Sequence, residues 1–126
     1  MEKTVQIEFC TINFYEDYIV TIMNEGVHVD RYHNETLINM AEEYYNGKPF
    51  VYITHRINSY SVNPNIYKTT SKMRSLAGFA VVSEDFKAIK NAQIEKLFLN
   101  KPFGIFSNLE DAISWKDEVI KLDITD

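Results

Sequence analysis

Two almost uninterrupted apolar runs constrain the fold of this chain more than any other feature. They are FVYIT at positions 50–54 and LAGFAVV at positions 76–82. Runs this short, without a polar residue at every second position, are typical of β-strands that are covered on both faces. Covering both faces requires helices on either side of a sheet. The two runs therefore predict an α/β domain in which they form central strands.

The segments before these runs predict an opening β-hairpin and one helix. Apolar residues alternate with polar ones from position 5 to position 9, and the alternation continues on shifted parity at positions 12 and 14. This pattern predicts one long strand with a bulge near Cys10–Thr11, paired with a strand at positions 19–23. Asn34 is the predicted N-cap of the following helix, which ends before Gly47. Its apolar stripe consists of Leu37, Met40, Ala41 and Tyr44.

Capping signals predict three further helices. Asn63 followed by Pro64 starts a short helix that ends near position 73. Ser83 caps the next helix, and the S-x-x-E motif at positions 107–110 starts the last, after a short strand at 101–106. The buried face of the helix after Ser83 is predicted to be Phe86, Ile89, Leu97 and Phe98. The predicted element order is β-β-α-β-α-β-α-β-α, a mixed sheet of about five strands in a single domain spanning residues 1–126.

Composition narrows the functional class. A net charge of −5 disfavours a nucleic-acid-binding protein, because phosphate binding requires a clustered basic face. Cys10 is the only cysteine, so no internal disulfide forms and a reducing compartment fits best. No apolar run approaches the ~20 residues of a membrane span, and the acidic, alternating start is unlike a signal peptide. We expect a cytoplasmic protein without stable membrane insertion.

The C-terminal half resembles a known family. The segment GFAVVSEDFKAIKNAQIEKLF, followed by KPFGIFSNLEDAISW, is similar to the SpoIIAA-like pattern of buried strand, helix, proline, aromatic strand and final helix. The pattern ends in Ala-x-x-Trp, here Ala112 and Trp115. Trp115 lies off the apolar stripe of its own helix and is predicted to cover a sheet edge or an interface. The element order resembles the STAS domain (sulphate transporter and anti-sigma-factor antagonist). This resemblance implies a small cytoplasmic regulatory or protein-interaction module without catalysis.

The segment HRINSYSVNP at positions 55–64 is the predicted recognition edge. It follows a buried strand, and ligands gather beyond the carboxyl ends of parallel strands. The candidate binding residues are His55, Arg56, Ser59, Tyr60, Ser61 and Asn63. Free amides at the helix start after Pro64, together with the basic pair, would suit an acidic or phosphorylated group. The alternative interpretation is a solvated loop whose Asn and Ser side chains satisfy their own backbone.

The same segment has a specific place in the resemblance. In phospho-regulated STAS domains it holds the acceptor serine, within an Asp-Ser-Ser-Gly motif that is absent here. We therefore expect that phosphorylation of Ser59 or Ser61 does not regulate the protein. Replacing Arg56 and Tyr60 by alanine is expected to leave folding nearly intact while weakening the dominant partner.

Catalytic and cofactor motifs are absent from the sequence. Neither the phosphate-binding and dinucleotide-binding glycine patterns nor a nucleophile elbow occurs, and the four glycines are isolated. The three histidines and Cys10 lack metal-ligand spacing. We expect no enzyme activity, no cofactor and no metal.

Two kinds of partner stay open. The leading expectation is a protein partner, with self-association included. The alternative is a small-molecule or lipid ligand in an apolar groove over the sheet. A sizeable apolar pocket would favour the ligand, and a packed core with an exposed aromatic patch would favour the protein partner.

Overall fold

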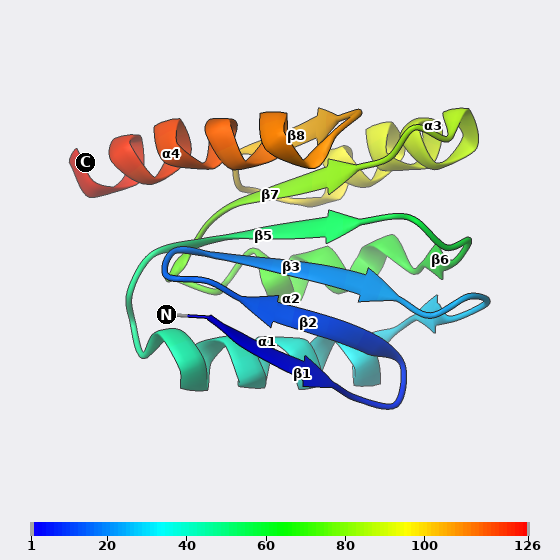
Figure 1. Ribbon diagram of the computed structural model, residues 1–126, viewed down its shortest axis with the longest axis horizontal. Helices are drawn as coiled ribbons and strands as arrows, with labels where there is room; N and C mark the ends of the chain where they lie inside the picture. Colours follow the sequence, from blue (N-terminus) through cyan, green and yellow to red (C-terminus); the bar gives the residue numbers. More distant parts are fainter. Residues whose placement is uncertain (1, 126) are drawn as a thin grey trace.

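The computed structural model describes residues 2–125 and contains a six-stranded mixed sheet (Figure 1). The strand order is β1-β2-β3-β5-β7-β8. The first three strands are antiparallel, and β3, β5, β7 and β8 are parallel. Their bounds are β1 Lys3–Gln6, β2 Cys10–Phe14, β3 Tyr18–Met23, β5 Phe50–His55, β7 Leu76–Val82 and β8 Phe103–Phe106.

The two apolar runs of the sequence are β5 and β7, and both lie inside the sheet as predicted. Every residue of β7 is buried, and β5 is buried at four of its six positions. Their central place confirms that an apolar run without a polar face indicates cover on both sides.

The opening of the chain differs from the prediction. Residues 3–14 form two antiparallel strands, β1 and β2, instead of one long bulged strand, with Val5 opposite Ile12. The amide of Ile7 donates to the carbonyl of Cys10 at 3.0 Å and closes the turn between them. The shift of parity near Cys10 therefore marks a reversal of the chain, and the sheet gains a sixth strand.

Helices cover the two faces of the sheet unequally. One face packs against α1 (Arg31–Tyr45), α2 (Tyr67–Thr70) with its preceding 3₁₀ turn η1 (Pro64–Ile66), and α3 (Phe86–Glu95) with the following turn η2 (Lys96–Phe98). The other face packs against α4 (Leu109–Thr125), which covers β5, β7 and β8. Over β1 and β2 this second face is polar, and the Thr4 hydroxyl donates to Asn13 Oδ1 at 2.8 Å.

Close packing against the end of the sheet involves α4 and two glycines. Trp115 lies over β7 and β8, where a Cβ atom at Gly78 or Gly104 would meet its ring within 3.3 Å. Its indole ring also packs against Phe106, with ring centroids 5.5 Å apart. Trp115 therefore covers the β8 end of the sheet, one of its two predicted locations.

The helix caps lie near the predicted positions but on other residues. Asp30, and not Asn34, caps α1, and its amide donates to the His33 ring. Asp85 caps α3 by accepting from the Ala88 amide, while Asn108 accepts from the Asp111 amide at the start of α4. Ser83 and Ser107, the predicted caps, each precede the actual cap. Asn63 caps η1 as predicted, by accepting from the Asn65 amide.

The predicted buried face of α3 is wrong. Phe86 and Leu97 are 78% and 83% exposed, whereas Ala92 and Glu95 are buried. The helix is rotated because Glu95 forms a buried ion pair with Arg56 in the loop after β5. This rotation leaves large apolar side chains on the surface of the helix.

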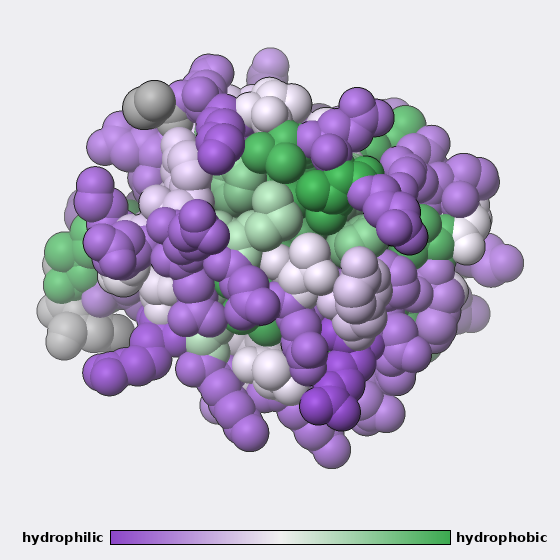
Figure 2. Space-filling view, turned by 90° about the horizontal axis from the view of Figure 1, so that it is seen from below, coloured by the Kyte–Doolittle hydropathy of each residue, from purple (hydrophilic) through white to green (hydrophobic). Residues whose placement is uncertain are grey.

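Figure 2 shows the molecule from below, the side of β1 and α1 in Figure 1. Hydrophobic side chains gather in the middle of this face, within a margin of polar ones. The partly buried hydrophobic residues of these two elements include Val5 and Met40. In the part of the chain that the structure describes, none of the helices is both long and apolar enough to cross a membrane.

Candidate functional site

An open groove lies beyond the carboxyl ends of the parallel strands, between the loop after β5 and one side of α3. Figure 1 shows both segments at the same end of the sheet. We call it the carboxyl-end groove; its volume is about 950 Å³. Its lining residues come from positions 25–27, 56–62 and 64, and from Asp85, Lys87, Ala88, Asn91, Ile94 and Glu95. The sequence placed a recognition edge at this end of the sheet.

The loop that forms one wall is fixed by backbone hydrogen bonds to the segment after β3. The Gly26 amide donates to the Ser59 carbonyl at 2.8 Å, and the Ser61 amide donates to the Val27 carbonyl at 3.0 Å. These contacts belong to a second, two-stranded parallel sheet of β4 (His28–Val29) and β6 (Ser61–Val62). Because its backbone is paired, this wall has its shape before any partner binds.

Side-chain hydrogen bonds also fix the loop after β5 to the end of β3 and the segment after it. Asn58 Nδ2 donates to the Met23 carbonyl at 2.9 Å, and Glu25 Oε1 accepts from the Ser59 amide at 2.9 Å. The Asn and Ser residues of the loop therefore bond to a neighbouring segment, and not only to their own backbone. This arrangement differs from the solvated loop considered as the alternative.

A buried ion pair forms the floor of the groove. Arg56 Nη1 donates to Glu95 Oε2 at 2.8 Å and Nη2 donates to Oε1 at 2.5 Å, with the two side chains 6% and 7% exposed. The Tyr67 hydroxyl also donates to Glu95 Oε1, at 2.6 Å. Both oxygens of the carboxylate are thus occupied by donors, so Glu95 joins α3 to the loop and to α2.

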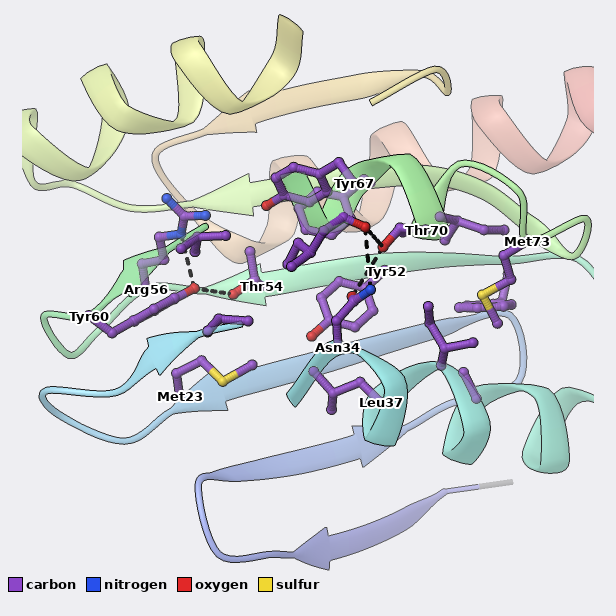
Figure 3. Close-up of a pocket in the computed structure, with 18 residues that line it drawn as sticks. Met23, Asn34, Leu37, Tyr52, Thr54, Arg56, Tyr60, Tyr67, Thr70 and Met73 are labelled. Carbon is purple, nitrogen blue, oxygen red and sulfur yellow. Dashed lines mark hydrogen bonds between the residues drawn. The ribbon is translucent and has the colours of Figure 1, made fainter. Parts of the chain in front are cut away.

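Arg56 and Tyr60 extend this network toward the sheet. Arg56 Nε donates to the Tyr60 hydroxyl at 3.0 Å, and that oxygen lies 2.7 Å from Thr54 Oγ1 (Figure 3). The guanidinium carbon also lies 5.2 Å from the centre of the Tyr60 ring, a cation–π distance. Arg56 is therefore held from several sides and is not free to reach a partner.

The pKa values follow from this burial. Burial alone would lower the pKa of Arg56, but its hydrogen bonds with Glu95 and the nearby charges outweigh burial, and the pKa is raised. Burial is the main reason why the pKa values of Tyr60 and Tyr67 are raised. The guanidinium thus stays charged and both phenols stay neutral, as their hydrogen bonds require.

Two isoleucines with exposed side chains form the apolar part of the groove. Ile57 is 63% exposed on the loop, and Ile94 is 51% exposed on α3. Exposed apolar surface bordered by polar groups is a feature of surfaces that bind other molecules. Polar groups surround them, among them Ser59, Asn91 and Lys87.

The structure brings four of the six predicted residues to the groove. Arg56, Ser59, Tyr60 and Ser61 line it, whereas His55 and Asn63 are not part of that lining. Ser61 Oγ lies 2.7 Å from His28 Nδ1.

Asn63 has a structural role. It caps η1 and donates from Nδ2 to Asp30 Oδ1 at 3.1 Å. Its side-chain oxygen occupies the Asn65 amide, and the helix that follows is very short. The predicted anion site at this helix start is therefore not formed.

Sequence reasoning missed the residues that α3 contributes. Glu95, Ile94 and Lys87 all line the groove, yet the sequence patterns assigned none of them to a site. The exposed isoleucine carried a detectable signal, because an apolar residue off the predicted buried stripe needs an explanation. Glu95 carried none, since its partner lies 39 positions away.

A second, internal cavity lies between the sheet, α1 and α2 (Figure 3). Its lining is mainly apolar and includes Met23, Leu37, Tyr52 and Met73. Its volume is about 40 Å³, which is room for only a few water molecules. Pockets for small-molecule ligands usually measure ≈ 300–1,000 Å³. This cavity is thus far smaller than a usual ligand pocket.

Comparison with known proteins identifies the fold. No protein-family model matches the chain, and no curated protein matches its sequence. The structure is similar to the crystal structure of an uncharacterised protein of the DUF3478 family, with a SpoIIAA-like fold, from Shewanella loihica. The TM-score is 0.56, and the match covers 92% of this chain and 95% of that chain at 13% sequence identity. The fold of this chain is SpoIIAA-like, as its C-terminal sequence pattern implied, and identity this low carries the fold alone.

Proposed function

We propose that this protein is a non-catalytic interaction module of regulatory type, and that the carboxyl-end groove binds a segment of a partner protein. The observation that carries the proposal is the combination of a preformed polar wall with two exposed isoleucines. Ile57 and Ile94 offer apolar contact, and the fixed loop offers hydrogen-bonding groups at its rim. This is the composition of a protein-binding surface with an apolar centre and a polar margin.

The chemistry of the groove supports a non-catalytic role. A general base needs a free acceptor within reach of a substrate, whereas both oxygens of Glu95 already accept hydrogen bonds. Cys10 is fully buried in β2, and burial raises the pKa of its thiol to about 12. A neutral, inaccessible thiol is a poor nucleophile.

A small apolar ligand has less support. The internal cavity is the place where such a ligand would bind, and its volume of about 40 Å³ is too small for a lipid chain. Binding there would require α1 or α2 to move away from the sheet and to break the contacts of Asn34 with Ile66 and Thr70. The protein partner therefore remains the leading proposal.

The experiment is affinity capture from native lysate, with mass spectrometry of both proteins and small molecules. The bait is compared with a double variant, Ile57→Glu with Ile94→Glu, and with the control Ile124→Glu on α4. Ile124 is 68% exposed, so the control adds the same charge at a comparable site far along the chain. We expect a protein that the parent and the control retain and the double variant loses. Retention by all three baits, or recovery of a bound small molecule instead, would contradict the proposal.

A further inference from the structure

A second surface, separate from the groove, lies at the β8 edge of the sheet. β8 is the last strand of the sheet and pairs with β7 alone among the described residues. Beside it, α3 and the turn η2 expose Phe86 and Leu97, the two most exposed large apolar side chains of the described residues. We propose that two copies of this chain associate through β8 and this flank of α3, about a twofold axis.

Helical spacing sets the direction in which Phe86 and Leu97 point. Phe86 precedes Glu95 by nine residues, about two and a half turns, so the two lie on opposite flanks of the helix. Glu95 faces β5, where it meets Arg56. Leu97 lies in the turn that continues α3, two residues beyond Glu95, and again points away from it. Both apolar side chains are therefore on the flank nearer β8, the neighbour of α3 at that side of the sheet (Figure 1).

One side of β8 has no strand paired with it among the described residues. The carbonyls of Pro102 and Phe106 accept from the amides of Phe79 and Ser83, so residues of this parity face β7. Main-chain groups alternate in direction along a strand, so those of Phe103 and Ile105 point away from the sheet. They form a ready template for another strand.

The two ends of the sheet differ in how their edges are protected. β1, at the opposite end, carries Lys3 and three further residues of which none is fully buried. A charged, exposed edge of this kind discourages pairing with another strand. The β8 sequence is FGIF and holds no charge. The β8 end is therefore the edge suited to association.

Charge complementarity selects a second copy as the occupant. The exposed acidic residues Glu84 and Asp85 lie at the start of α3, while Lys96 and Lys101 lie at its other end, before β8. Pairing β8 antiparallel with β8 of a second copy places the acidic end of each α3 beside the basic end of the other. The same twofold axis brings Phe86 of one copy to Leu97 of the second, and Gly104 opposite its own equivalent. Such an interface is self-complementary, as a twofold dimer requires.

The residues of α3 between Phe86 and Leu97 are compatible with the proposed twofold dimer. Gln93 lies between Phe86 and Leu97 along the helix, on the same flank, and is uncharged. Lys90 lies on the same flank, four residues after Phe86 and seven before Leu97, and the twofold axis places it opposite the uncharged Gln93 of the second copy. On the other side of the sheet, Trp115 and Phe106 pack against each other with tilted rings at the β8 edge and extend the apolar contact.

The first test is sedimentation equilibrium of the parent chain and two matched variants. Leu97→Glu places a charge in the proposed interface, and Ile94→Glu places the same charge on the other flank of the same helix. Both side chains are exposed, so we expect both variants to keep the parent's circular dichroism and unfolding midpoint. We expect a dimer for the parent, a rise of at least about tenfold in its dissociation constant for Leu97→Glu, and no change for Ile94→Glu. A parent chain that is monomeric at about 100 μM, or equal effects of the two variants, overturns the proposal.

The second test is cross-linking, which reports the antiparallel arrangement. Phe86→Cys protein and Leu97→Cys protein are oxidised separately and as a mixture, and the buried native Cys10 does not compete. We expect a disulfide dimer in the mixture and little in either protein alone. Equal cross-linking in all three samples contradicts the arrangement. Both tests leave the groove intact or probe it only as a control, so a monomeric result bears on the dimer and not on the proposed partner binding.

Discussion

Arg56 and Glu95, 39 positions apart in the sequence, form a two-pronged ion pair inside the protein. The pair joins the loop after β5 to α3, and these two segments are the walls of the carboxyl-end groove. The shape of the groove therefore depends on one internal contact. The sequence-based expectation that Arg56 serves a partner directly, and is dispensable for folding, conflicts with this geometry.

Removing one member of the ion pair is predicted to destabilise the fold. Arg56→Ala leaves Glu95 buried and deprived of its charged partner, which costs about 3–5 kcal/mol in comparable cases. Urea unfolding followed by circular dichroism measures this loss. The double variant Arg56→Met with Glu95→Leu removes both charges and is expected to recover most of it. A cost below about 1 kcal/mol for Arg56→Ala would mean that the pair does not fix the groove.

Gly78 is predicted to be intolerant of a side chain. A Cβ atom there would lie 2.9 Å from Val119 Cγ1, 3.3 Å from the Pro102 carbonyl oxygen and 3.3 Å from the Trp115 ring. Gly78→Ala should therefore cost about 1–3 kcal/mol by overpacking. The combination with Val119→Ala removes the nearest atom, so the two costs should sum to more than the cost of the double variant. Strictly additive costs in thermal unfolding would contradict this account of the contact between β7 and α4.

The buried thiol of Cys10 is predicted to make the protein less stable at alkaline pH. Burial raises its pKa from 9.0 to about 12, so above pH 9 the unfolded chain loses this proton before the folded protein does. The folded state then binds more protons than the unfolded state, and the free energy of unfolding falls as pH rises from about 9 to about 12. Urea unfolding at several pH values should show a shallower fall for Cys10→Ala than for the parent. Identical pH profiles would show that the thiol does not titrate as its burial implies.

The central strands of the fold could be predicted from the sequence because each is marked by a local run of apolar residues. The strands β5 and β7 were predictable from two apolar runs, since only cover on both faces explains a strand without a polar side. The first two strands were not, because the turn from Ile7 to Cys10 contains neither glycine nor proline and resembles a bulge in the sequence. A bulge and a reversal of the chain shift the parity of apolar residues in the same way. Only the pairing of Val5 with Ile12 in the structure shows that the chain reverses here.

The candidate site was predictable in position but not in composition. The loop after β5 follows from the strand, and the structure places that loop at one wall of the groove. The other wall is formed by α3 and depends on how this helix is rotated about its axis. The spacing of apolar residues in the helix predicted that Phe86 and Leu97 are buried. A single long-range ion pair turns Glu95 inward instead. No helical periodicity reports such a contact, because the penalty for exposing two apolar residues is offset by a partner on a different element.

The measurement that tests the central claim most directly is the affinity of the purified, captured partner for matched groove variants. Isothermal titration compares the parent with Ile57→Glu, Ile94→Glu and the control Ile124→Glu, at a concentration where the self-association of each variant is known. The account predicts that each groove variant weakens binding by at least about tenfold, or ~1.4 kcal/mol, and that the control binds like the parent. Unchanged affinity for both groove variants would contradict the claim that this groove is where the protein recognises its partner.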